Sequence, residues 1–206
     1  MADRLSIYRG ALQLLGAGEI ASLTEDIPPK RALDNAWEPV VNYVLKRGLW
    51  NFAIRTVELA VDDDVEPLFG YSHAFSKPTD WVRTAGIANE PTFMAEFEQY
   101  RDDNGYWFAD ADPLYVRYVS SDPAYGWNVG AWPQDFAEVI EARLAFKANL
   151  PVSSDRGNRN DMFQLFEKAL KEAKTLDAVD EAVQRRKPGR LVQSRFVGGR
   201  NRFNGY

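Results

Sequence analysis

His73 is the only histidine in the chain, so a catalytic triad or an imidazole metal site would have to be built around it. It lies in an aromatic, strand-like run at residues 71–75, away from any recognisable set of nucleophile, base and acid. We therefore interpret it as a structural residue. The chain has no cysteine, which excludes disulfides, thiolate nucleophiles and zinc–sulfur sites.

Two acidic clusters, at residues 62–64 and 102–104, could offer oxygen ligands to a hard cation. Neither has the spacing of an EF-hand loop, which extends over about twelve residues and ends in a glutamate. Phosphate-binding glycine motifs are absent as well. The clusters are therefore interpreted as solvated turns, and we predict no metal and no cofactor.

Paired carboxylates of a glycoside hydrolase meet in space and leave no local signature in a sequence. A tail-associated cell-wall or polysaccharide hydrolase therefore remains an alternative. No residue can be assigned to it, and the prediction is that the protein is not an enzyme.

The C-terminal residues 183–206 combine positive charge with apolar side chains. They contain seven basic residues and no acid, so the preceding 182 residues must carry −12 to give the total of −5. Such a segment can be a solvated terminus, a nucleic-acid-binding module or a docking arm for an acidic protein. The regular alternation of apolar and basic residues favours docking over nucleic-acid binding. The candidate partner-binding residues are Arg185, Arg186, Lys187, Arg190, Leu191, Arg195, Phe196, Arg200, Arg202 and Phe203.

The elements that must position these groups follow from hydrophobic periodicity. Apolar stripes at helical spacing predict helices over 4–15, 30–47, 133–149 and 155–182, the last with Leu176 on its apolar face. Alternation predicts a strand over 50–59, and residues 92–119 indicate a β-meander whose first turn is Asn104-Gly105. No apolar run approaches the roughly 20 residues of a membrane span.

This order predicts an α+β fold with a four-helix bundle, an inserted antiparallel β-rich lobe and an extended C-terminal arm. We expect residues 1–49 and 126–182 to form the bundle, residues 50–125 the lobe and residues 183–206 the arm. The length of 206 residues suits one domain with an inserted lobe.

Several short motifs occur in a characteristic order. They are Leu-Leu-Gly at 14–16, Leu-Thr-Glu-Asp at 23–26, Trp-Asn-Phe-Ala at 50–53, a proline–aspartate element at 74–83 and a late helix at 136–151. In this order the chain resembles the tail tubular protein A, or head-to-tail adaptor, family of short-tailed bacteriophages. Lys77 and Trp81 stand where the family usually has leucines.

The resemblance implies a structural protein of the virion tail, assembled in the host cytoplasm. Such proteins form a homo-oligomeric ring, a dodecamer, between the portal protein and the tail nozzle (tail tubular protein B-like), and they support tail fibres. It implies that the C-terminal arm reaches the portal and that genomic DNA passes down the channel without specific binding. An acidic body suits a DNA conduit, because negative walls repel phosphates.

Overall fold

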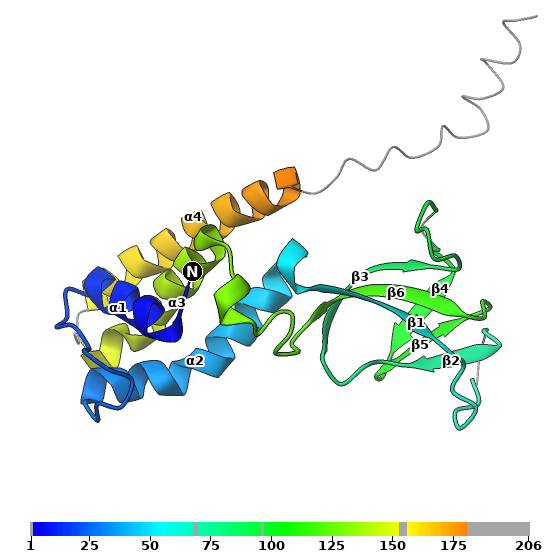
Figure 1. The fold of residues 1–206 in the computed structure, drawn as a ribbon, viewed down its shortest axis with the longest axis horizontal. Coiled ribbons are helices and arrows are strands. Elements are labelled where there is room, and N and C mark those ends of the chain that lie inside the picture. The colour runs from blue at the N-terminus through cyan, green and yellow to red at the C-terminus, as the bar shows by residue number, and fades with distance from the viewer. Residues whose placement is uncertain (1, 68–69, 96, 153–155, 181–206) are drawn as a thin grey trace, which may run out of the picture.

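The computed structural model describes residues 2–67, 70–95, 97–152 and 156–180. Helices gather at one end of an elongated molecule and strands at the other (Figure 1). The helices are α1 (Arg4–Leu14), α2 (Pro28–Arg47), α3 (Gln134–Val152) and α4 (Arg156–Asp180), with short 3₁₀ turns at Asn51–Ala53 and Val129–Ala131. The predicted α+β class is confirmed, while the predicted arm at residues 183–206 lies outside the described residues.

The third helix organises the helical end, because α3 packs against α1, α2 and α4. Its apolar residues lie on several sides, which is what a helix covered by three neighbours requires. At the start of α1, Asp3 and Ser6 form a reciprocal capping box that satisfies free backbone N–H groups. The contact from α1 to α2 includes the Tyr8 hydroxyl, which donates to Asp34 at 2.9 Å.

The strands form two three-stranded antiparallel sheets, and the predicted single meander over 92–119 is wrong. They are β1 (Ile54–Leu59), β2 (His73–Ser76), β3 (Trp81–Ala88), β4 (Tyr100–Asp103), β5 (Tyr106–Ala109) and β6 (Leu114–Ser120). One sheet has the order β1-β6-β3 and the other β2-β5-β4. The largely buried β6 takes a central position between two partners distant in sequence, whereas a meander would pair it with β5.

The hairpin between β4 and β5 is confirmed, with Asn104 and Gly105 at φ values of 42° and 84°. Its first strand begins at Tyr100, eight residues after the predicted start of the meander at residue 92. Ahead of it, the amide of Phe97 donates to the carbonyl of Ile87 at 2.8 Å, so this segment lies beside β3.

The predicted strand over 50–59 begins only at Ile54, because Trp50 and Ala53 belong to the helical core. Trp50 is buried there and its indole Nε1 donates to the carbonyl of Val44 at 3.0 Å. A continuous strand from residue 50 would remove this side chain from the core. The chain instead turns through Asn51–Ala53 before it enters the sheet.

Two hydrophobic clusters stabilise the two ends of the molecule. The larger cluster joins the four helices and includes Trp50, Phe136 and Phe166. The smaller cluster is formed by strand residues of both sheets, among them Phe75, Trp107 and Val116. The prediction that Leu176 lies on the buried face of α4 is wrong, since its side chain is 55% exposed. Among the described residues, the helices are too short or too polar to span a bilayer.

Candidate functional site

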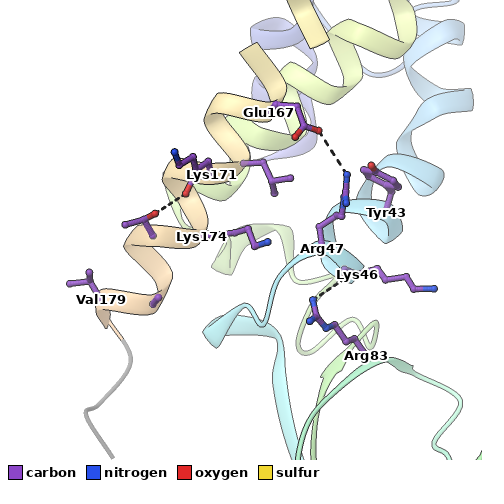
Figure 2. A pocket seen from close by; sticks show the side chains of 11 residues that line it. Tyr43, Lys46, Arg47, Arg83, Glu167, Lys171, Lys174 and Val179 are labelled. Atoms are coloured by element: carbon purple, nitrogen blue, oxygen red, sulfur yellow. Dashed lines mark hydrogen bonds and ion pairs between the residues drawn. The ribbon is translucent and has the colours of Figure 1, made fainter. Parts of the chain in front are cut away.

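A groove of about 1070 Å³ lies where the last turns of α2, the start of β3 and the C-terminal half of α4 meet (Figure 2). Five of its side chains are basic and one is acidic. They are Lys46 and Arg47 from α2, Arg83 from β3, and Glu167, Lys171 and Lys174 from α4. Because these residues are separated in sequence by up to 128 positions, only the tertiary fold brings them together.

Local contacts at the turn after α2 fix the α2 side of the groove. A Cβ atom on Gly48 would lie 2.6 Å from the Trp50 indole, so the indole occupies the space that a side chain would need. The guanidinium of Arg83 donates to the carbonyl of Lys46 at 3.4 Å, which joins β3 to the end of α2. These contacts hold Lys46 and Arg83 at the groove.

The α4 side is tied to the same turn by one residue. The amide of Asn51 donates to the Asp177 carboxylate at 3.0 Å, and the Asn51 side-chain amide donates to the Asp177 carbonyl at 2.7 Å. With this contact in place, Lys171 and Lys174 lie on the groove face of α4. Figure 2 shows Lys174 extending from α4 toward the α2 side of the groove.

Two arginines surround Tyr43 at the end of the groove where Glu167 lies (Figure 2). The guanidinium carbon atoms of Arg47 and Arg143 lie 5.1 and 4.3 Å from the centroid of the Tyr43 ring. Arg47 has one acidic neighbour, Glu167, at 3.8 Å. The Arg143 side chain is nine-tenths buried, and its Nε atom has no hydrogen-bond partner in the described part of the chain. Burial, together with the positive charge of Arg47, lowers the pKa of Arg143.

Aromatic rings partly compensate the buried guanidinium. Phe146 and Phe166 also lie within 5.0 Å of Arg143, and a cation over an aromatic face gains about 0.5–2 kcal/mol. The rings supply no hydrogen-bond acceptor to the Nε–H group. The groove beside this buried cation therefore presents mainly positive charge, which favours an anionic occupant.

Asp80, directly before the start of β3, forms a second polar cluster. Its carboxylate accepts hydrogen bonds from Arg55 at 3.0 Å, Tyr118 at 3.0 Å and Ser120 at 2.5 Å. Burial by itself opposes ionisation of Asp80, but the three donors hold the pKa of the carboxyl below its usual value. Since every donor comes from β1 or β6, the cluster fixes the proline–aspartate element against the sheet.

The acidic cluster at residues 62–64 lies beside β2, since the amide of Asp62 donates to the carbonyl of Ala74 at 2.8 Å, but among the described residues the His73 side chain has no hydrogen bond or ion pair with an acid. His73 begins β2 and pairs with Ala109, and the cluster at residues 62–64 forms a turn in which the amide of Asp64 bonds to Asp62. Among the described residues, no group of three or more potential ligands could hold a metal ion. The half-buried Glu141, whose pKa burial and the Glu138 charge raise to about 7, lies against α1 and outside this groove.

The candidate residues of the C-terminal segment all fall outside the described residues, so their role stays a prediction. The groove was not predicted from the sequence. Its only local signal is the repeat of Glu167, Lys171 and Lys174 at positions i, i+4 and i+7 on α4. No family model matches the chain, and no curated protein matches it.

Proposed function

We propose that this protein is a structural subunit of a short-tailed phage tail, a head-to-tail adaptor that joins the portal to the tail nozzle. In this proposal the helices form a four-helix bundle, residues 183–206 form the portal-binding arm, and the β-sheets face the nozzle and tail fibres. Copies assemble into a ring, a dodecamer, that surrounds the DNA channel.

The observation that carries the proposal is the division of the molecule into two ends with separate hydrophobic cores (Figure 1). An adaptor must present one surface to each of two neighbours. Each end of this molecule can do so without disturbing the core of the other. The ordered motifs at 14–16, 23–26 and 50–53 give this shape its specific interpretation.

The chemistry of the groove supports a binding role. Its polar side chains are mainly lysines and arginines, and its one carboxylate, Glu167, lies beside Arg47. A hydrolase of the predicted alternative class would need two carboxylates across a substrate cleft, separated by roughly 5–9.5 Å.

The test is assembly with portal rings of the same phage. The full chain is expected to join the portal and form a second ring in negative-stain images, whereas a chain ending at residue 182 remains folded by circular dichroism and fails to co-sediment. Equal co-sedimentation of the truncated chain contradicts the role of the arm. Clearing of peptidoglycan or polysaccharide by the purified protein contradicts the structural role itself.

A further inference from the structure

The groove in Figure 2 contains positive charge that the described residues leave uncompensated. Within those residues the ammonium groups of Lys46, Lys171 and Lys174 have no ion pair. Arg143 is buried and does not line the groove, but it packs on the groove residue Tyr43 and adds positive charge close by. Like charges at close range repel, so an anionic occupant would relieve this repulsion.

Apolar side chains also line the groove, and they indicate the kind of anion. They are Tyr43, Leu170, Ala178 and Val179, and the side chain of Val179 is 75% exposed. A nucleic-acid backbone would use the lysines and leave these apolar atoms uncovered. An acidic peptide with aliphatic residues would satisfy both parts of the lining.

The chain itself carries a segment of this composition at residues 60–67, between β1 and β2. It contains four acids and the half-exposed Val65, whereas Val61 packs against the smaller hydrophobic cluster of its own molecule. The side chains of Asp63, Asp64 and Glu66 are exposed and have no ion pair in the described parts of the chain. Its exposed carboxylates thus complement the positive charge of the groove, and Val65 offers it an aliphatic side chain.

The segment cannot reach the groove of its own molecule. Six-residue β1 separates the two, which corresponds to roughly 20 Å, and carries the segment away from the helices (Figure 1). The other segment to consider, residues 183–206, has the same sign of charge as the groove and would be repelled.

We propose that the groove binds the 60–67 segment of a second copy of this chain. The contact joins two different surfaces of the two copies, so it is heterologous. Contacts of this kind produce a ring when the rotation between successive copies closes. Ring closure rests on the proposed function, whereas the contact itself requires only the groove and the segment.

The first experiment titrates the full-length protein into a fluorescently labelled peptide of residues 60–67 and follows anisotropy. We expect saturable binding that weakens with salt and becomes at least about tenfold weaker for the Lys171→Glu/Lys174→Glu variant. The matched control is Lys147→Glu/Lys168→Glu, which changes the net charge equally outside the groove and should bind normally. Circular dichroism checks that both variants are folded.

Three outcomes overturn the proposal. They are absence of saturable binding to the wild-type protein, equal loss of binding in the control variant, and unchanged binding of a peptide with Asp63→Asn and Asp64→Asn. A labelled DNA duplex provides the competing probe. If the duplex binds through Lys171 and Lys174 and the peptide does not bind, the groove is a nucleic-acid site and the proposal fails.

The second experiment uses charge reversal in the full chain and zero-length crosslinking. Lys171→Glu/Lys174→Glu disables the groove, and Asp63→Lys/Asp64→Lys disables the segment, so neither variant should crosslink to itself. Their mixture should give a heterodimer, because each retains the surface that the other has lost. The contact is contradicted if the mixture gives no heterodimer, or if either variant alone still crosslinks to itself as the wild type does.

The two proposals fail differently. If both variants still form rings on the portal, the contact is wrong and the adaptor function stands. If the peptide binds and the heterodimer forms but no ring assembles on the portal, the contact stands and the adaptor function is wrong.

Discussion

The Tyr118 hydroxyl in β6 donates a hydrogen bond to the Asp80 carboxylate over 3.0 Å. Asp80 precedes β3, so this bond joins the loop that introduces one edge strand to the central strand of the sheet. Arg55 of β1 donates to the same carboxylate, which thus connects all three strands at the end that faces the helices.

We expect Asp80→Ala to lower the free energy of unfolding by about 3 kcal/mol, because it leaves three donors without an acceptor in a largely buried place. Urea denaturation followed by tryptophan fluorescence measures this. Asp103→Ala, at an exposed ion pair with Arg101, is the control and should cost less than about 1 kcal/mol. Similar losses in the two variants would show that the Asp80 cluster has no special role.

Acid should weaken the same cluster. The folded pKa of Asp80 is lowered, so the stabilisation it provides is present above the unfolded value of about 3.9 and is lost as the pH falls through the lower folded pKa. The difference in unfolding free energy between wild type and Asp80→Asn should therefore shrink below about pH 4. A difference that stays constant from pH 7 to pH 2 would contradict this.

Glu141 should act in the opposite direction. Its folded pKa of about 7 lies above the 4.5 of a free glutamate, so its contribution to stability is complete below pH 4.5 and is lost as the pH rises through 7. Glu141→Gln should raise the unfolding free energy at pH 8 by about 1–2 kcal/mol, allowing for partial exposure, and leave it nearly unchanged at pH 4. Glu19→Gln, at an exposed position between α1 and α2, is the control. An equal gain of Glu141→Gln at pH 8 and pH 4 would refute the assignment.

Gly126 cannot accept a side chain without movement of the backbone. A Cβ atom there would lie 2.2 Å from the Ser120 carbonyl oxygen and 3.2 Å from the Leu45 methyl groups, where β6 returns to the helices. Gly126→Ala should therefore cost about 1–3 kcal/mol in thermal or urea unfolding. Gly18→Ala, with open space around it, should be neutral or slightly stabilising. Equal behaviour of the two variants would contradict the close approach.

Arg143 should reduce stability relative to an apolar side chain of similar size. Its Nε–H is buried without an acceptor, so Arg143→Met should raise the unfolding free energy by about 1 kcal/mol despite the lost cation–aromatic contacts. Chemical denaturation measures the change, and a marked destabilisation would show that the aromatic contacts outweigh the burial cost. Lys147→Met, at an exposed position on α3, gives the effect of removing a surface charge.

Local sequence determined the elements that depend on neighbouring residues. The periodic apolar stripes located α1 to α4 to within a few residues, because a helix closes its hydrogen bonds within its own segment. The hairpin at Asn104-Gly105 was equally predictable, since its turn requires positive φ at both residues. Composition likewise placed the positive charge of residues 183–206 apart from an acidic body.

Only the tertiary structure decided which strands pair and which cations gather. The partners of β6 lie up to 65 residues away in sequence, and backbone hydrogen bonds between strands carry no side-chain code that identifies a distant partner. The groove follows from the same physics: Trp50 and Asn51 turn the chain so that α2, β3 and α4 meet. Lys46, Arg83 and Lys174 become neighbours there because packing at this turn, and no property of their own, brings them together.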